Sequence, residues 1–219
     1  AHAAASAARG GARLFVGHSE RFNPVVRALA RLVREDGAVS IDLRRVGPSR
    51  PCGCGALINL GIHDIDLAAY LGGGDVVLRG AVGGSLTRDS TEDFARVVFT
   101  TGGGAVGQLT VDRTLPAKER VIDLATRRWL YHGDLLAHRL TRMFRGESLH
   151  SDVPLLLDEP LMAQAVALAD ALDGAPVHDL ATGADGIAAV EIAEQAAAQC
   201  AAPPSGPRGS ENLSVDARR

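Results

Sequence analysis

The sequence predicts an α+β fold in which an open, mostly antiparallel β-sheet carries helices on one face, preceded by the end of a separate α/β domain. Alternating apolar segments between residues 75 and 126 are separated by short turns, which is the spacing of an antiparallel meander. Segments with helical periodicity flank this run on both sides. The chain begins with an alanine-rich helix followed by a short apolar strand, the order found in doubly wound α/β domains.

Helix and strand signals alternate through the first 74 residues. Strong helix formers at the start of the chain stop at Gly10-Gly11, a helix C-terminal signal. Asn23 is placed to cap a helix whose first turn holds Pro24. The apolar segment INLGIHDIDLAAYLGG has the composition of a buried helix and ends at a run of glycines. We expect helices at 1–9, 24–36 and 58–73, and strands at 12–17 and 39–47.

Turns rich in Gly, Asp, Ser or Pro separate the strands expected in the second half of the chain. These strands are expected at 75–86, 92–101, 104–114 and 118–126, with edge strands at 129–131 and 135–140. Two helices should follow at 159–174 and 183–200, before a tail at 203–219 whose Pro, Ser and charge content predicts disorder.

The composition indicates a globular protein and excludes two classes of partner. Hydrophobic residues make up 46% of the 219 residues, enough for a sizeable core, and aromatic residues only 4%. A formal net charge of −3 gives no support to a nucleic-acid or polybasic membrane role, and no apolar run approaches the ~20 residues that a membrane span needs. The odd number of cysteines, Cys52, Cys54 and Cys200, fits a reducing cytoplasm better than a disulfide framework, so we expect a cytoplasmic location.

Three glycines match a dinucleotide-binding pattern in the wrong context. Gly102, Gly104 and Gly107 fit G-x-G-x-x-G, which must follow a strand and open a helix to cradle a pyrophosphate. Here the pattern joins two segments that both alternate as strands. We therefore interpret it as a glycine-rich hairpin.

Four polar side chains interrupt the helix expected at 58–73: Asn59, His63, Asp64 and Asp66. Buried polar groups need partners, so these groups are either satisfied structurally or line a cavity where chemistry happens. Asn59 and His63 are four residues apart and project from one helix face, and histidine is well suited to exchange a proton near neutral pH. A core histidine bonded to a backbone carbonyl is the alternative. For Asp64 and Asp66 we expect salt bridges to arginines of the adjoining sheet.

A metal site is not expected. Cys52 and Cys54, with His18 and His63 in the neighbouring motifs, suggest metal ligands. However, C-x-C is tight for zinc, and no second pair of ligands completes a set of four.

The segments VGHSERFNP (16–24) and ALINLGIHDIDLAAYLGG (56–73) resemble two signatures of the Gfo/Idh/MocA family of NAD(P)-dependent sugar and polyol dehydrogenases. In that family an N-terminal Rossmann domain binds the nicotinamide cofactor, and a C-terminal α/β domain with an open antiparallel sheet supplies the substrate pocket and the oligomer contacts. The resemblance implies that residues 1–17 are the end of a truncated, Rossmann-type dinucleotide-binding domain. Residues 18–202 would be the substrate and oligomerisation domain, and 203–219 a tail.

The resemblance also implies roles for individual residues. His63 would be the general acid/base that takes the hydroxyl proton as hydride leaves the substrate carbon. Asn59 stands where the family usually has Asp, and an amide cannot supply the negative charge that would raise the pKa of the histidine. The other candidates lie at the cofactor–substrate boundary: Arg21, Asn23 and His18 toward the substrate, and Phe22 toward the cofactor. Asn23 also fits a purely structural role as a helix cap.

The expected function is therefore an NAD(P)-dependent oxidoreductase of sugars, nucleotide sugars or cyclitols, with NAD or NADP bound mostly by a domain upstream of Ala1. We also expect a homo-oligomer formed through the open sheet. Two alternatives stay open. One is a non-catalytic, truncated homologue that acts as a binding or oligomerisation module, which Asn59 favours, and the other is a small metal-binding module.

Overall fold

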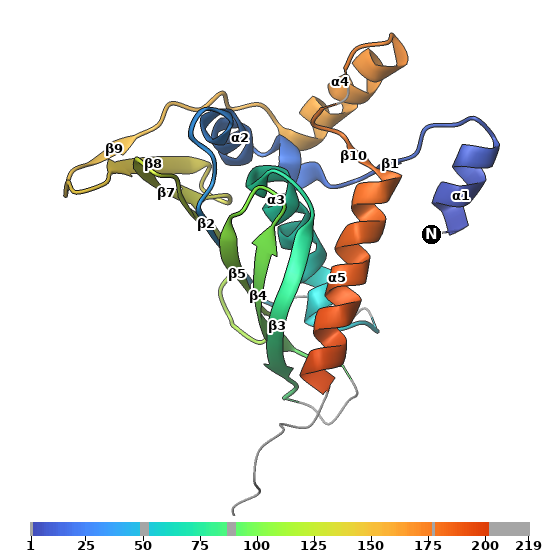
Figure 1. The fold of residues 1–219 in the computed structure, drawn as a ribbon, viewed down its shortest axis with the longest axis horizontal. Helices are drawn as coiled ribbons and strands as arrows, with labels where there is room; N and C mark the ends of the chain where they lie inside the picture. The colour runs from blue at the N-terminus through green and yellow to red at the C-terminus, as the bar shows by residue number, and fades with distance from the viewer. Residues whose placement is uncertain (1, 49–52, 87–90, 177, 202–219) are drawn as a thin grey trace, which may run out of the picture.

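The computed structural model describes residues 2–48, 53–86, 91–176 and 178–201, and its elements follow one another as Figure 1 shows. The helices are α1 (His2–Arg9), α2 (Pro24–Asp36), α3 (Ile62–Gly72), α4 (Pro160–Leu172) and α5 (Gly183–Ala201), with a short 3-10 helix η1 (Ser19–Phe22) and a π-helical turn η2 (Leu57–Gly61). The strands are β1 (Phe15–Val16), β2 (Ser40–Val46), β3 (Val76–Gly84), β4 (Phe94–Thr101), β5 (Val106–Asp112), β6 (Glu119–Ala125), β7 (Trp129–Asp134), β8 (Arg139–Phe144), β9 (His150–Asp152) and β10 (Ala181–Thr182).

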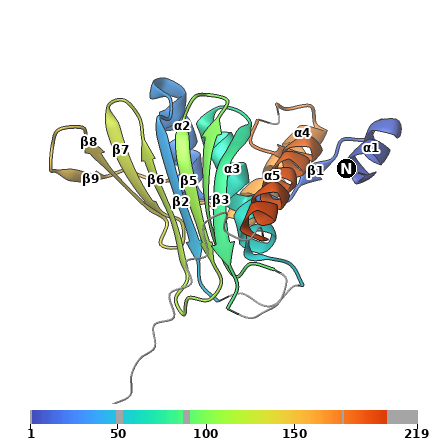
Figure 2. The same ribbon diagram turned by 60° about the horizontal axis from the view of Figure 1, so that its bottom comes forward.

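Eight strands form one open sheet in the order β3-β4-β5-β2-β6-β7-β8-β9. Every neighbouring pair is antiparallel except β2 and β5, which are parallel, so β2 joins two antiparallel blocks. Figure 2 shows α2 and α3 behind the sheet, whose front face is open. The predicted α+β architecture, with a mostly antiparallel sheet and helices on one face, is confirmed.

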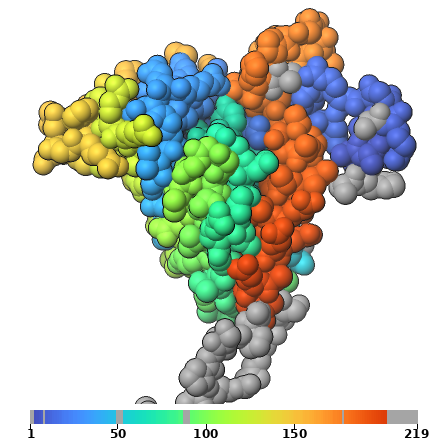
Figure 3. Space-filling view, viewed as in Figure 1, coloured from blue at the N-terminus to red at the C-terminus, as the bar shows by residue number. Residues whose placement is uncertain are grey.

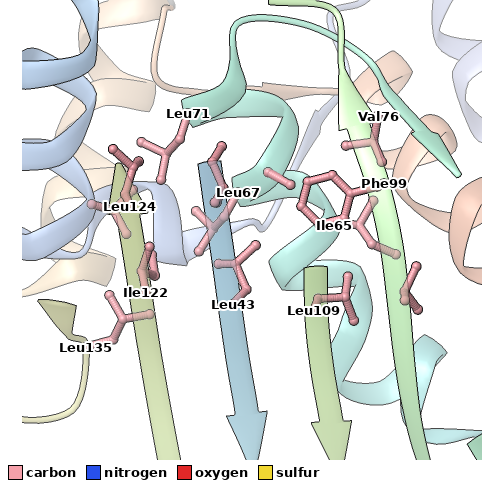
Figure 4. Packing of buried hydrophobic residues seen from close by; sticks show 14 of the residues in the cluster. Leu43, Ile65, Leu67, Leu71, Val76, Phe99, Leu109, Ile122, Leu124 and Leu135 are labelled. Atoms are coloured by element: carbon pink, nitrogen blue, oxygen red, sulfur yellow. The ribbon is translucent and has the colours of Figure 1, made fainter. Parts of the chain in front are cut away.

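The core lies between the sheet and α3. Alternate residues of the strands are buried toward the helices, for example Ile41 and Leu43 on β2 and Leu109 on β5. They pack against Leu67 and Leu71 of α3 in one continuous apolar cluster (Figure 4). Burying each side chain of this size contributes about 1.5–3 kcal/mol, which holds α3 in place and with it the polar residues that α3 carries.

The helix expected at 58–73 is confirmed, but its first turn is π-helical. The amide of Ile62 donates to the carbonyl of Leu57, five residues earlier. The α-helix that follows ends at Gly72, and Gly73 adopts the left-handed conformation, with a φ of 72°. A π-helical turn changes the direction in which neighbouring side chains project, and such turns are frequent at functional sites.

The edge strand expected at 135–140 is wrong. The main chain turns after Asp134, whose side-chain oxygen accepts hydrogen bonds from the amides of Leu136 and Ala137, both at 2.9 Å. His138 then adopts a positive φ of 49°, and β8 begins at Arg139. An aspartate that binds the amides following it favours a turn over a strand. The structure also adds β9, which was not predicted.

The N-terminal segment is attached through a small second sheet. β1 pairs antiparallel with β10, with Phe15 opposite Thr182. Figure 3 shows α1 and α4 projecting from the body of the molecule. The domain boundary after residue 17 stays a prediction, and the tail at 203–219 lies outside the described residues. Among the described helices, none combines the length and the apolar character needed to cross a bilayer.

Candidate functional site

The site is built where η1 meets the beginning of α3, and a buried ion pair joins the two elements. Arg21 of η1 donates from Nε to Oδ2 of Asp66 at 2.8 Å and from Nη2 to Oδ1 at 2.6 Å. Both residues are at most 5% exposed, and the guanidinium also lies 5.0 Å from the ring centroid of Tyr70. A bidentate arginine–carboxylate pair fixes orientation as well as distance, so it sets the position of η1 on α3.

A second ion network joins the same two elements to the sheet. Arg45 of β2 donates from Nε to Asp64 at 2.9 Å and from Nη1 to Glu20 at 3.0 Å. Glu20 also accepts a hydrogen bond from Arg120 of β6 at 2.7 Å. The expected salt bridge from α3 to an arginine of the sheet is confirmed for Asp64. For Asp66 the expectation is wrong, because its arginine comes from η1.

Between these networks lie two histidine rings in edge-to-face contact. The ring centroids of His18 and His63 are 5.9 Å apart, and the ring planes meet at 87°. His18 is only 5% exposed, yet neither of its ring nitrogens has a hydrogen-bond partner among the residues that the structure describes, and the same holds for the buried Nδ1 of His63. Leaving a buried polar group unsatisfied costs about 1–3 kcal/mol. The pair therefore has the donors and acceptors to bind a small polar group.

The surroundings favour the neutral form of both rings. Burial, and after it the positive charge of Arg45, lower the pKa of His63 to about 4. Burial also lowers the pKa of His18, against the opposing effect of Asp66. A neutral imidazole has one nitrogen that donates and one that accepts a hydrogen bond, so at pH 7 His63 is in the form that accepts a proton.

Asn59 lies in η2, one turn before His63. Its backbone N–H donates to the carbonyl of Gly55 at 3.0 Å, and the residue is half-buried. The expectation that Asn59 and His63 share one helix face rested on regular α-helical spacing, whereas Asn59 lies within the π-helical turn and His63 lies in the α-helix that follows it. The pairing of these two residues on one substrate atom stays a prediction.

Asn23 is a helix cap in this structure. Its side-chain oxygen accepts a hydrogen bond from the amide of Val25 at 3.0 Å, and Nδ2 donates to the carbonyl of Leu135 at 3.0 Å. These bonds fix the start of α2. A contact of Asn23 or of Arg21 with substrate stays a prediction. In the structure, two N–H donors of Arg21 already bind Asp66.

Phe22 belongs to a different apolar cluster from the residues that pack around α3. Its ring is buried against Ala171 and Leu180 in a second, smaller apolar cluster. It also lines a cleft of about 760 Å³ between α2 and α4 that includes neither His63 nor Asn59. The predicted contact of Phe22 with a cofactor is not tested by this arrangement.

The structure also shows where the glycine pattern lies and which cysteines are bonded. Gly102 and Gly104 lie in the turn between β4 and β5, and Gly107 lies within β5, so the predicted hairpin is confirmed. Among the described residues, no group of three or more His, Cys, Asp or Glu side chains is arranged to hold a metal ion. Cys54 is disulfide-bonded, contrary to the expectation of free thiols, and Cys200 is free, while Cys52 lies outside the described residues.

Sequence reasoning missed Arg45, Glu20 and Arg120. A signal for Arg45 was present, because Ile41, Leu43 and Arg45 share one face of an alternating strand whose other members are core residues. An arginine at a core-facing position requires a buried counter-ion. Glu20 and Arg120 carried no comparable signal, since their contacts join segments 100 residues apart in the sequence.

Comparisons with known proteins relate the sequence and the fold to a known family. Residues 27–134 match the family model described as the GFO/IDH/MocA C-terminal domain. No curated protein matches the sequence. Among solved structures, UDP-N-acetylglucosamine 3-dehydrogenase from Acidithiobacillus ferrooxidans is similar at a TM-score of 0.78 and 23% identity, over 89% of this chain and 64% of that one.

Two further structures have the same fold. Aldose-aldose oxidoreductase from Caulobacter crescentus, complexed with glycerol, matches at a TM-score of 0.74 and 18% identity, over 89% of this chain and 64% of that one. Levoglucosan dehydrogenase, in complex with NADH and levoglucosan, matches at a TM-score of 0.67 and 17% identity, over 87% and 64%. The chain thus spans less than two thirds of the length of each of these proteins.

Proposed function

Because the chain belongs to the GFO/IDH/MocA family through its C-terminal domain, we propose that it is the substrate-binding part of an NAD(P)-dependent oxidoreductase. The reaction would remove a hydride from a secondary alcohol carbon of a sugar, nucleotide sugar or cyclitol. Structural neighbours that act on UDP-N-acetylglucosamine, aldoses and levoglucosan support a general oxidoreductase role. The observation that carries the proposal is the contact of the buried ring of His18 with the half-buried ring of His63, whose inner nitrogens have no partner among the described residues.

His63 is the proton acceptor in this proposal. Oxidising a secondary alcohol releases a hydride from carbon and a proton from oxygen, and the proton needs a base within hydrogen-bond reach. When bound, the nicotinamide ring of NAD or NADP accepts the hydride. The lowered pKa of His63 keeps its imidazole unprotonated at neutral pH, so its lone pair is open to the hydroxyl proton, and it also makes the ring a weaker base than an ordinary histidine. Asn59 supplies a hydrogen bond to the same substrate.

The remaining residues position the substrate and the cofactor. The ion pair of Arg21 with Asp66 holds η1 against α3, which places His18 beside His63. A contact of Phe22 with the cofactor is part of this proposal. The G-x-G-x-x-G pattern of Gly102, Gly104 and Gly107 lies in a hairpin and opens no helix, so in this proposal it does not hold the phosphates of the cofactor.

The open face of the sheet is the proposed self-association surface. Valines of β3, β4 and β5 are exposed on it, among them Val82 (69%), Val98 (47%) and Val106 (56%). Exposed apolar side chains that gather on a sheet face favour burial against a second surface. We place the working form of the protein in the cytoplasm as a homo-oligomer.

The test is an activity assay with a variant of the proposed base. The purified chain, alone and with the nucleotide-binding domain encoded upstream if there is one, is incubated with NAD or NADP and UDP-N-acetylglucosamine, an aldose or a cyclitol. His63→Gln should lower kcat by about 10²–10⁴-fold. His132→Gln, which changes an exposed histidine of β7, is the matched control and should leave kcat unchanged.

Two results would count against the proposal. Equal kcat for His63→Gln and the unaltered protein would refute His63 as the base. Absence of turnover with every substrate, while sugar still binds, would favour the non-catalytic binding module, to which the amide of Asn59 already points.

A further inference from the structure

His18 is the buried titratable group with the least explanation in the fold. It is 5% exposed, and both of its ring nitrogens are orphaned among the described residues. The nearest anionic atom, Oδ1 of Asp66, lies 3.9 Å from Nε2, which is beyond hydrogen-bond distance, and it is already held by Arg21. A histidine kept only for packing gains nothing from two unsatisfied nitrogens, so the ring has the properties of a ligand contact.

The geometry of the pair suits one shared oxygen atom. The ring centroids of His18 and His63 are 5.9 Å apart and the rings are edge-to-face. Because the rings are in contact, one nitrogen of each can lie within hydrogen-bond distance, about 2.7–3.2 Å, of a common oxygen atom beside them. Each ring also offers an orphaned nitrogen, Nδ1 in the case of His63.

We propose that His18 and His63 form a two-histidine hydroxyl-binding site, in which both rings bond the same oxygen atom: a water in the free protein and the reacting hydroxyl of a secondary alcohol in the complex. The binding of the reacting hydroxyl rests on the proposed function, whereas the binding of a water in the free protein does not. His63 accepts the proton of that oxygen through Nδ1, and an N–H of His18 donates to it.

The different roles of His18 and His63 follow from the hydrogen-bonding groups of a neutral imidazole. Each carries one N–H and one lone pair, so a hydroxyl donates to His63 and accepts from His18 at once. As the carbon loses its hydride to the nicotinamide, the O–H bond breaks, its proton passes to His63, and the C–O bond becomes C=O. The oxygen gains negative charge during this step, and the N–H of His18 stabilises it as an oxyanion donor would.

The charges around the pair act on the pKa values of the two rings in both directions. His18 is faced by an anion on α3, a cation on η1 and an anion on α5, and His63 by cations on β2 and β6 and an anion on η1. These are Asp66, Arg21 and Asp185 for His18, and Arg45, Arg120 and Glu20 for His63. Protonation of either ring opposes protonation of the other, so the two rings titrate as a coupled pair.

The first test uses the free chain and needs no catalysis. A high-resolution crystal structure should show one ordered water bonded to both rings. Imidazole ¹H–¹⁵N spectra from pH 3 to pH 8 should show the pKa of His63 rising by about one unit in His18→Phe, since the like charge is removed. His132→Gln is the control and should leave the pKa of His63 unchanged. A structure without an oxygen bonded to both rings, or an unchanged pKa in His18→Phe, would overturn the two-histidine site.

The second test addresses the reaction. His18→Phe should lower kcat by about 10²-fold with little change in KM, because the donor acts on charge that develops in the transition state. His18→Gln keeps an N–H donor and should recover part of kcat, and it serves as the second variant if His18→Phe folds poorly. Equal losses in both variants would refute the donor role of His18. Full activity in His63→Gln, together with a water bonded to both rings in the unaltered protein, would refute the proposed base and leave the two-histidine site standing.

Discussion

The burial of His63 predicts that the fold loses stability in acid over a defined range of pH. The pKa of this ring is about 4 in the folded protein, against 6.5 for an unperturbed histidine. Between those two values the unfolded chain binds a proton that the folded chain does not. The free energy of unfolding therefore falls as the pH is lowered from about 6.5, and the fall is complete once the pH is below the folded pKa near 4.

The size of the effect follows from the difference between the two pKa values. At 1.36 kcal/mol per pKa unit, the change from 6.5 to about 4 corresponds to at most about 3 kcal/mol. This is a large fraction of the 5–15 kcal/mol that typically stabilises a domain. The pKa of His18 is lowered as well, which adds a loss of the same sign. Only a comparison with a variant isolates the part that belongs to His63.

The assay is urea unfolding of the protein and of His63→Gln at pH 7.5 and at pH 3.5, followed by the fluorescence of Trp129. Glutamine does not titrate, so the drop in unfolding free energy between the two pH values should be smaller in the variant by up to about 3 kcal/mol. Any loss of packing caused by the substitution is present at both pH values and cancels. An equal drop in the two proteins would mean that the ring is hydrated, and the argument from burial would fail.

Three further predictions concern the ion pair, the hairpin and the open face. Asp66→Asn leaves the buried arginine of η1 without its counter-ion and should lower the unfolding free energy by about 3–5 kcal/mol in urea titrations; a loss typical of a surface site would contradict the pair's structural role. Gly107→Ala places a Cβ against the β2 backbone and a phenylalanine ring and should cost about 1–3 kcal/mol, whereas Gly80→Ala, with open space around it, should cost little. Val98→Asp should lower the oligomer fraction in light scattering, while Leu172→Asp, on α4, should not; equal behaviour of these two variants would exclude the open face as the association surface.

Periodicity predicted most elements of this fold because each signal is local. The alternation of β2 and β4 and the Asn23–Pro24 start of α2 needed only a few neighbouring residues to be recognised. The order of strands was beyond such reasoning. Nothing in the alternation of β2 indicates that its neighbours are β5 and β6, whose residues lie some 65 to 85 positions later in the chain.

The sequence predicted which residues belong to the site better than it predicted how they are arranged. The two motifs singled out His18 and His63, and the structure brings their rings into contact. Their environment depended on distant pairings, such as Arg45 with Glu20, that no spacing rule contains. The π-helical turn before His63 was likewise unpredicted, because the five residues that form it have no composition that distinguishes them from an α-helix.

The position of β2 has a consequence for how the molecule folds. The blocks β3-β4-β5 and β6-β7-β8-β9 are each made of strands adjacent in the sequence, so each needs only short loops to close. β2 is synthesised before either block, and it acquires both of its neighbours only after residues 106–125 are in place. Its insertion is a high-contact-order event, expected to come late and to limit the rate of folding. Because Arg45 arrives with β2, the environment that keeps His63 neutral is completed in the same step that unites the sheet.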